Sequence, residues 1–360
     1  MKFNRYALSD LATIKYGKNQ KKVLSENGNI PIYGTGGLMG YATTALYDKP
    51  SVLIGRKGTI GKVKYVEHPF WTVDTLFYTI VNTDIVLPKY LYYVMSLIDL
   101  NNYNEGTTIP SLRTETLNRL EFDIPSLVEQ ETILSCLNPI DEKIALNNAI
   151  NNNLEQQAQA IFKSWFIDFE PFSNRKPSEW SVSTLGNVSI MGAGGDKPQN
   201  VSPIKTDLYE HPIYSNGLSN EGLYGFTDKP KISEESVTVS ARGTIGFVCL
   251  RHIPYVPIVR LVTLIPKTEI ISAKYLYLWL KQLHITGTGT TQQQLTVPDF
   301  QKTEILVPSQ EIVTLFTATV EPIFEKIWFN QNENEKLSSL RDTLLPKLMT
   351  GELDVSDTEI

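Results

Sequence analysis

The chain has 360 residues, of which 41% are hydrophobic and 20% charged, a composition typical of soluble globular proteins and too apolar for a disordered chain. It contains no apolar run of about 18 residues, the length that crosses a bilayer, and no apolar signal core near the N-terminus. We therefore expect no contact with a membrane. Only two cysteines occur, Cys136 and Cys249, which excludes a disulfide framework and favours the reducing cytoplasm. We expect both thiols to be buried and inert.

Charge is distributed unevenly along the chain. The formal net charge is −6, but residues 1–126 carry +3 and residues 171–309 carry +2. Residues 127–170 carry −5 and residues 310–360 carry −6. Net charge describes possible partners rather than fold. The two mildly basic segments are thus weak candidates for contact with nucleic acid.

Short motifs recur in one order at offsets of 174 to 185 residues. This recurrence predicts two copies of one unit, each a globular part followed by a helical part. The matched pairs are Tyr6 and Leu11 with Trp180 and Leu185, Pro31-Ile32-Tyr33 with Pro212-Ile213-Tyr214, Asp48-Lys49-Pro50 with Asp228-Lys229-Pro230, Gly58-Thr59-Ile60-Gly61 with Gly243-Thr244-Ile245-Gly246, Lys89-Tyr90-Leu91-Tyr92 with Lys274-Tyr275-Leu276-Tyr277, Gly106-Thr107-Thr108 with Gly289-Thr290-Thr291, Pro125-Ser126 with Pro308-Ser309, and Glu142-Lys143-Ile144 with Glu325-Lys326-Ile327.

Each globular part is predicted to be rich in β-structure with some helix. Two short β-type runs, 51–54 and 63–66, flank a glycine-bearing turn, which indicates a hairpin. A helix with regularly spaced aromatic residues is predicted from Pro88 to Leu100, followed by a polar loop over 101–110. The second copy repeats the hairpin at 236–239 and 247–250, the helix at 273–283 and the loop at 286–298.

Each helical part carries an apolar seam with alternating steps of four and three residues, which is typical of helices packed against one another. Asn147, Asn151, Asn330 and Asn334 take the two remaining seam positions of the copies. They either set the register of the pairing or are avoided by a seam that rotates onto Leu146 and Ile150. The apolar seam consists of Ile133, Leu137, Ile140, Ile144, Leu154, Ala158, Ile161 and Trp165, and in the second copy of Phe316, Val320, Ile323, Ile327, Leu337, Leu344 and Leu348, with Arg341 as the one charged member.

Pro139 and Pro322 are predicted to mark a helix start or a kink near the beginning of each arm. If about 28 residues after each proline are helical, each arm is roughly 42 Å long at ~1.5 Å per residue. Half-sites one turn of DNA apart, roughly 34–36 Å, would then be within reach.

The expected fold is α+β, with two β-rich domains, two long helical regions that form an antiparallel coiled coil, and pseudo-two-fold internal duplication. The predicted boundaries are 1–126 and 171–309 for the β-rich domains, 127–170 and 310–350 for the helical regions, and 351–360 for a C-terminal tail.

These motifs resemble those of type I restriction-modification specificity subunits, and the resemblance covers nearly the whole chain. It rests on the duplication, on the turns 56–61 and 241–246, and on Pro-Ser pairs that lead into helices containing Glu-Lys-Ile. The resemblance implies two target-recognition domains that each read half of a split target in double-stranded DNA. It also implies helices that dock two adenine-N6 methyltransferase (modification) subunits, with motor-nuclease (restriction) subunits joining for cleavage.

Three sets of loops are candidates for DNA contact, because arginine and lysine suit guanine and phosphate while asparagine and glutamine suit adenine. In each set the alternative is a purely structural turn or loop. The sets are the turns Arg56-Lys57-Gly58-Thr59 and Arg242-Gly243-Thr244, the loops containing Gly36 and Asn216, and the loops Thr107-Thr108 and Thr290-Thr291-Gln292-Gln293.

No catalytic constellation emerges from the sequence. The four histidines are scattered, no His/Cys cluster has zinc spacing, and no phosphate-binding loop of the Gly-x-x-x-x-Gly-Lys type occurs. The segment from Ile32 to Gly36 resembles a nucleotide loop, but a lone Gly-x-Gly is weak, and the chain contains no Pro-Pro dipeptide such as amino-methyltransferases need. We therefore expect a non-catalytic subunit that binds no cofactor, with S-adenosylmethionine, ATP and Mg on partner subunits.

Two other functions fit the sequence. The chain could serve a related type II system with a fused methyltransferase-nuclease, which only the partner distinguishes. It could also be a duplicated protein-interaction scaffold without a DNA role, in which loss of Arg56 and Arg242 would be harmless.

Overall fold

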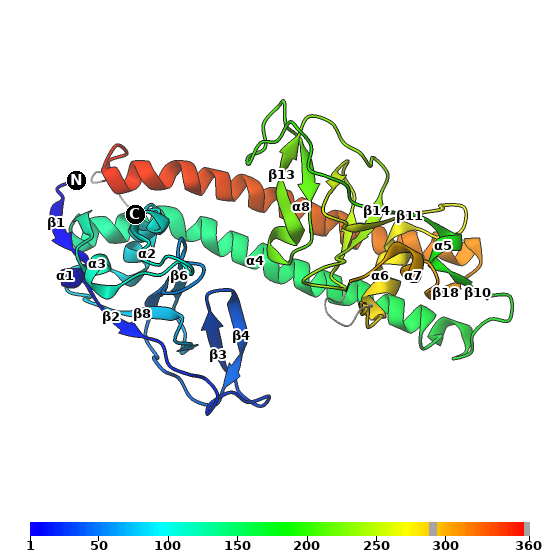
Figure 1. Cartoon of the computed structure of the whole chain (residues 1–360), viewed down its shortest axis with the longest axis horizontal. Helices are drawn as coiled ribbons and strands as arrows, with labels where there is room; N and C mark the ends of the chain where they lie inside the picture. The colour runs from blue at the N-terminus through cyan, green and yellow to red at the C-terminus, as the bar shows by residue number, and fades with distance from the viewer. Residues whose placement is uncertain (288–293, 356–360) are drawn as a thin grey trace. The chain divides into compact units, whose positions relative to one another are not determined.

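The computed structural model describes residues 1–287 and 294–355 and divides the chain into two compact units. Unit 1 comprises residues 1–147 and 332–360, and unit 2 comprises residues 148–331. Each unit holds one β-rich part and a stretch of both long helices, α4 (Leu127–Phe166) and α8 (Gln310–Thr350) (Figure 1). Among the helices of the described residues, none has the length and apolarity needed to cross a membrane.

The β-rich part of unit 1 precedes α4 in the chain. Its elements are β1 (Asn4–Ala7), α1 (Leu8–Leu11), β2 (Ala12–Tyr16), β3 (Ile30–Gly34), β4 (Gly37–Ala42), β5 (Ser51–Gly55), β6 (Val63–Val66), β7 (Trp71–Thr72), β8 (Leu76–Val81), α2 (Pro88–Ser96), the 3-10 helix η1 (Leu100–Tyr103), α3 (Thr114–Asn118) and β9 (Glu121–Ile124).

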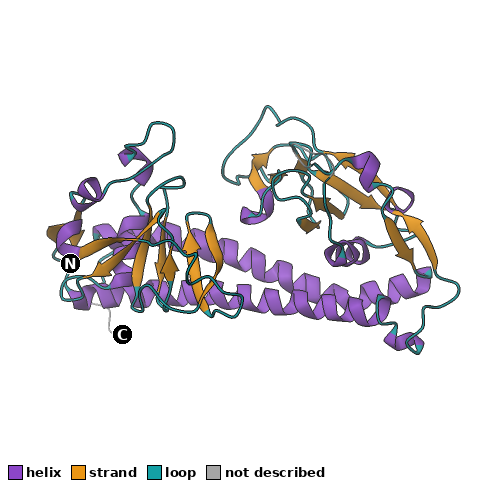
Figure 2. Cartoon of the chain, turned by 60° about the horizontal axis from the view of Figure 1, so that its bottom comes forward, coloured by secondary structure: helices purple, strands orange, loops and turns teal. Residues whose placement is uncertain are grey.

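The β-rich part of unit 2 lies between α4 and α8 in the chain, and its strands are orange in Figure 2. Its elements are η2 (Glu170–Phe172), β10 (Ser181–Thr184), α5 (Leu185–Val188), β11 (Ser189–Ala193), β12 (His211–Tyr214), η3 (Ser219–Gly222), β13 (Leu223–Thr227), β14 (Ser236–Val239), β15 (Val248–Arg251), β16 (Val256–Pro257), β17 (Val262–Pro266), α6 (Ala273–Gln282), α7 (Val297–Phe300) and β18 (Glu304–Val307).

The two β-rich parts have the same sheet topology. The four-stranded sheets run β2-β8-β5-β6 and β11-β17-β14-β15, and the three-stranded sheets run β4-β3-β7 and β13-β12-β16. In both three-stranded sheets the last pair is parallel, and a two-stranded pair, β1-β9 or β10-β18, completes each part. The two predicted hairpins are present as β5-β6 and β14-β15. The internal duplication and the α+β class predicted from the sequence are thus confirmed.

Within each unit, α4 and α8 pack antiparallel. In unit 1, Arg341 Nη1 donates to Asp141 Oδ1 at 3.1 Å, and Asn147 Nδ2 donates to Asn334 Oδ1 at 2.9 Å. In unit 2, Asn330 Nδ2 donates to Asn151 Oδ1 at 2.8 Å. Partner numbers fall on α8 as they rise on α4, which is the order that antiparallel helices require.

The asparagines lie on the seam itself. Asn147 and Asn330 are fully or almost fully buried, whereas Leu146 is 55% exposed. The seam therefore does not rotate onto Leu146, and the amides bond across the helix pair in the manner of register-setting polar residues. Arg341, the charged seam position, is accommodated by its ion pair with Asp141.

The helices are longer than the sequence suggested. Pro139 lies inside α4, and Pro322 lies inside α8, so the expectation that a proline starts the helix is wrong. α4 begins directly after Ser126, whose side chain accepts from the Glu129 backbone N–H while the Glu129 carboxylate accepts from the Ser126 N–H, which caps the helix. With 40 residues α4 is about 60 Å long rather than 42 Å.

Equivalent places in the two cores are filled by different side chains. In unit 2, Phe162, Phe166 and Phe316 are essentially buried against Tyr275. At the equivalent places, 183 residues away, unit 1 carries Leu345, Met349 and Ile133. The helix pair thus meets the β-rich part through aromatic rings in unit 2 and through aliphatic side chains in unit 1.

One expectation about the cysteines is wrong. Cys249 is buried in β15, where burial raises the pKa of its thiol to about 12, but Cys136 is exposed on α4. Cys136 precedes the buried Leu137 and points away from the seam, because the helix turns by about 100° per residue.

Candidate nucleic-acid interface

The turn 56–59 links β5 to β6 and is exposed at Lys57, Gly58 and Thr59. Gly58 has a φ of +87°, a left-handed conformation that favours glycine. A Cβ on Gly58 would lie 3.9 Å from Thr35 Oγ1, so this turn lies beside the turn that joins β3 to β4. The neighbouring Gly36 is exposed, and nothing lies within 4 Å of where its Cβ would be.

The loop that carries Thr107 and Thr108 joins the same cluster. The Gly58 N–H donates to the Pro110 carbonyl at 2.9 Å, and Lys57 pairs with Ser111 as an isolated β-bridge. Thr107 and Thr108 themselves are exposed. Three segments that the sequence singled out separately therefore meet in unit 1, and we call the segments 34–37, 56–59 and 104–112 cluster 1.

The side chain of Arg56 is used to hold this cluster together. Its Nη1 donates to the Asp74 carbonyl at 2.8 Å, and its guanidinium lies 5.0 Å from the centre of the Tyr16 ring. Its backbone N–H also donates to the Thr75 carbonyl at 2.8 Å. Arg56 is only partly exposed, whereas Lys57 is exposed. The lysine is therefore the more accessible cation of the turn.

The loop is shaped by Asn104, whose Oδ1 accepts from the Gly106 and Ser111 backbone N–H groups at 2.9 Å each. A Cβ on Gly106 would lie 1.9 Å from the Ile109 carbonyl oxygen, so only glycine fits this close approach. These contacts project the Thr107-Thr108 tip outward.

Unit 2 brings together the corresponding segments, 215–217, 241–244 and 294–295, which we call cluster 2. Arg242 is exposed, and its Nε and Nη2 both donate to Gln294 Oε1, at 3.2 and 2.9 Å. Gly243 has a φ of +69°, and nothing lies within 4 Å of where its Cβ would be. Thr244 differs, because its hydroxyl is buried and has no hydrogen-bond partner within the described part of the chain.

Asn216 links two segments of cluster 2. Its Oδ1 accepts from the Ala241 N–H and its Nδ2 donates to the Val259 carbonyl, both at 2.7 Å. Both ends of the amide are therefore engaged by backbone. Val259 and Arg260 have φ values of 52° and 61°, and a left-handed β-branched residue such as Val259 is rare.

Backbone hydrogen bonds match the residues of the two clusters. The Leu112 N–H donates to the Arg56 carbonyl at 2.9 Å, and the Leu295 N–H donates to the Ala241 carbonyl at 3.0 Å. Arg56 is therefore equivalent to Ala241, and Lys57 is equivalent to Arg242. By the same matching, Ser111 is equivalent to Gln294.

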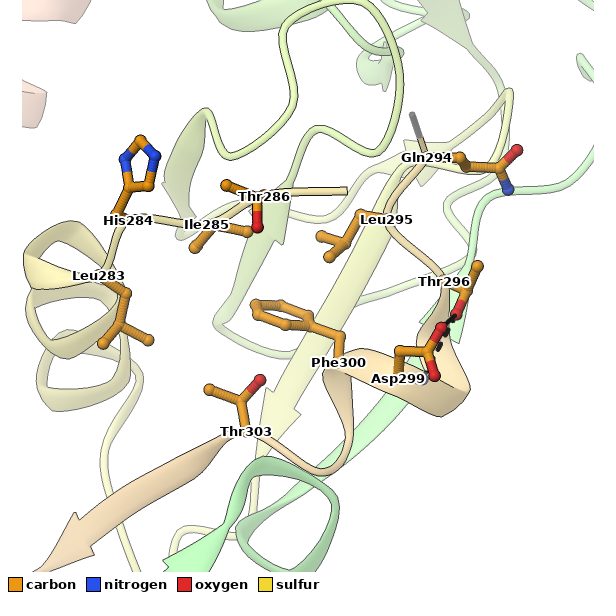
Figure 3. Close-up of a pocket in the computed structure, with 10 residues that line it drawn as sticks. All are labelled: Leu283, His284, Ile285, Thr286, Gln294, Leu295, Thr296, Asp299, Phe300 and Thr303. Atoms are coloured by element: carbon orange, nitrogen blue, oxygen red, sulfur yellow. Dashed lines mark hydrogen bonds between the residues drawn. The ribbon is translucent and has the colours of Figure 1, made fainter. Parts of the chain in front are cut away.

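Four candidate residues, Thr290, Thr291, Gln292 and Gln293, lie outside the described residues. A pocket of about 260 Å³ lies beside this segment, between the end of α6 and α7. In Figure 3 its apolar side chains, among them Leu283, Leu295 and Phe300, face one another, whereas the Gln294 amide points away from them. Gln294 is thus turned out of the pocket, and its amide oxygen bonds Arg242.

Short motifs did not reveal the residues that support the clusters. Tyr16, Asp74 and Val259 contribute a ring and two backbone carbonyls, for which sequence offers no pattern. Only the offset of 185 residues, which places Asp74 opposite Val259, could have indicated them. Within residues 1–287 and 294–355, no group of three or more His, Cys, Asp or Glu side chains could hold a metal ion.

Comparison with known proteins agrees with this duplicated architecture. The type I restriction modification DNA specificity domain matches twice, over residues 2–156 and 177–339. The MjaIX specificity subunit of Methanocaldococcus jannaschii is 28% identical over 354 residues, covering 87% of this chain and 79% of that protein. The HindI specificity subunit of Haemophilus influenzae is 28% identical over 386 residues, covering 81% and 84%.

A crystal structure of the S subunit of a type I restriction-modification system from M. genitalium has the same fold. It superposes with a TM-score of 0.56 at 18% identity and covers 97% of this chain and 96% of that one. The chain therefore belongs to the type I restriction-modification DNA specificity family, as a non-catalytic DNA specificity subunit that carries the family's domain twice.

Proposed function

We propose that cluster 1 and cluster 2 each bind one half of a bipartite, asymmetric target in double-stranded DNA. The observation that carries the proposal is that the same three loops converge in both units while the exposed side chains at matched places differ. Lys57 and Ser111 in one cluster stand where Arg242 and Gln294 stand in the other. A shared scaffold with different side chains is what two different half-sites require.

The chemistry of the clusters suits DNA. Lys57 and Arg242 are exposed cations that can bind phosphate or guanine, and Thr59, Thr107 and Thr108 present exposed residues with hydroxyl groups. Open space beside Gly36 and Gly243 leaves room for a phosphate backbone to approach closely. Arg56 and Asn216 act mainly by fixing the loops from which these side chains project.

We further propose that the helical regions, 127–170 and 310–350, dock two adenine-N6 methyltransferase subunits. Leu146 on α4 and Phe329 on α8 are equivalent by the 183-residue offset and are 55% and 60% exposed. Two matched apolar positions on acidic helices fit two copies of one protein partner better than they fit DNA. Motor-nuclease subunits would join this complex for restriction.

In this arrangement S-adenosylmethionine, ATP and Mg belong to the partner subunits, and the target-recognition domains span residues 1–126 and 171–309. The complex would act in the cytoplasm, where host DNA is available.

The test is to co-express the chain with the methyltransferase encoded beside it and to map N6-methyladenine on host DNA. We expect one split motif that depends on the chain. Lys57→Ala with Arg242→Ala should relax or abolish that motif, whereas Leu146→Asp with Phe329→Asp should abolish methylation by releasing the methyltransferase. A stable complex without chain-dependent methylation would contradict DNA reading, and an intact complex in the Leu146/Phe329 variant would contradict this docking surface.

A further inference from the structure

The side chain of Arg242 is oriented by a neutral partner. Gln294 Oε1 accepts from both Nε and Nη2, so the hydrogen bonds engage one edge of the guanidinium and fix the plane of the group. Among the described residues no carboxylate forms an ion pair with Arg242, and the arginine therefore keeps its full charge for another partner. Arg242 is also exposed.

The N–H groups of Arg242 that Gln294 does not use are arranged for a second, directional partner. A guanidinium has five N–H donors in a rigid plane. With Nε and one N–H of Nη2 engaged, both N–H groups of Nη1 and the other N–H of Nη2 remain. The pair formed by Nη1 and Nη2 matches the O6 and N7 acceptors that guanine presents in the major groove, the commonest specific contact of arginine with DNA.

The matched pair in unit 1 lacks this device. Lys57 ends in an ammonium, a point charge without a preferred plane, and Ser111 pairs with it through the backbone bridge. The two scaffolds are otherwise joined alike, since Leu112 and Leu295 donate to equivalent carbonyls. The difference between the pairs 57/111 and 242/294 is therefore one of side-chain chemistry, and it occurs where the loops converge.

The geometry points to Arg242 as the reader of one guanine in the half-site bound by unit 2, with Gln294 as the residue that positions its guanidinium. This inference rests on the proposed function and adds the base and the residue pair to it. A phosphate contact by Arg242 is the competing role, and the two roles differ in their dependence on sequence.

The experiment uses the complex of the chain with its methyltransferase and duplexes in which each base pair of the mapped target is replaced in turn. Competition binding gives the preference for the wild-type base at each position. We expect Arg242→Ala to remove the preference at a single guanine of one half-site, on the order of 10- to 100-fold, and to leave the other half unchanged. Arg242→Lys should lose most of the same preference, because lysine lacks the planar donor pair.

Gln294 is tested by two substitutions. Gln294→Ala frees the guanidinium, and we expect a loss of a few fold at the same guanine and nowhere else, whereas Gln294→Glu keeps an acceptor and should keep the preference. Lys57→Ala is the matched control, because any effect of this variant on base preference should fall in the other half-site.

Three results would overturn the inference. If Arg242→Ala weakens all duplexes equally and lowers the salt dependence of binding, Arg242 contacts phosphate. If Gln294→Ala leaves the guanine preference at its wild-type value, Gln294 does not position the arginine. If the wild-type complex forms but prefers no sequence, the proposed function itself fails, an outcome that differs from the other two because it appears without any substitution.

Discussion

Clusters 1 and 2 join the same three loops by different side chains. In unit 1 the loop after β7 is held by Arg56, which donates to the Asp74 carbonyl. In unit 2 the equivalent carbonyl, that of Val259, accepts from Asn216, which lies on another loop. The residue equivalent to Arg56 is Ala241, which has no side chain capable of such a bond. The anchoring role has therefore moved from one loop to another between the two copies.

The comparison teaches that the most conspicuous residue of a motif need not be the one that meets the ligand. Arg56 and Arg242 appear equivalent in the sequence because each precedes a glycine-bearing turn. In the structure Arg56 is an anchor, and the exposed cation equivalent to Arg242 is Lys57. Substitutions that separate anchors from exposed cations will sharpen this comparison.

The largest expected effect concerns the two cores rather than the loops. Phe166→Ala removes a ring that lies 4.9 Å from the rings of both Tyr275 and Phe316, and we expect it to destabilise unit 2 by about 3–5 kcal/mol. The equivalent Met349→Ala should destabilise unit 1 by less, about 2–3 kcal/mol, because it loses no ring–ring contacts. Urea denaturation followed by hydrogen exchange in each unit would measure both, and equal losses would contradict the distinction between aromatic and aliphatic docking.

An intermediate effect is expected at the anchors. Asn216→Ala leaves the Ala241 N–H and the Val259 carbonyl without their partner and should destabilise cluster 2 by about 1–2 kcal/mol. Arg56→Ala should have a smaller effect, about 1 kcal/mol, because its bond to Asp74 is more exposed. Both variants should weaken DNA binding without changing base preference, as measured by competition between duplexes. A change at a single base pair would instead make the substituted residue a reader.

The smallest expected effect is a pH dependence confined to unit 2. His252 stacks on Trp328 at 4.1 Å, and partial burial, with nearby Lys274 and Arg251, lowers the pKa of its imidazole to about 4. The unfolded chain, with a pKa near 6.5 for this group, binds more protons between these two values, so stability falls as pH falls from about 6.5 to 4. His252→Gln should flatten this part of the stability curve, measured by thermal unfolding at pH 7 and pH 5. His68→Gln in unit 1 serves as the control, and an unchanged slope in His252→Gln would contradict the assignment.

Much of the fold could be predicted because duplication repeats every signal. The hairpins β5-β6 and β14-β15 and the helices α2 and α6 each appear twice in the sequence, so weak local patterns confirm one another. The seam was predictable as far as the periodicity of apolar residues is maintained. Near the end of α4 it passes from the predicted Ile161 and Trp165 to the more deeply buried Phe162 and Phe166, because the helix there packs against the β-rich part as well as α8.

The remainder of the site could not be predicted from local sequence. Pro139 looked like a boundary, yet α4 begins earlier because the Ser126 cap and the buried Ile133 and Leu137 stabilise the turns before the proline. The convergence of segments near residues 35, 57 and 110 depends on sheet topology, which brings together loops that are far apart in sequence. The anchors act through backbone carbonyls, and every residue type except proline offers the same backbone groups.

The division of the chain has a consequence for the order in which it is made. Unit 2 is one continuous stretch, residues 148–331, whereas unit 1 needs residues 332–355 to return to a β-rich part that left the ribosome long before. The second half of α8 supplies Leu345, Leu348 and Met349 to the core of unit 1, and Asp354 pairs with the N-terminal amine. During synthesis, then, the second-made unit closes first, and the first-made unit waits with an uncovered apolar surface until the last helix arrives.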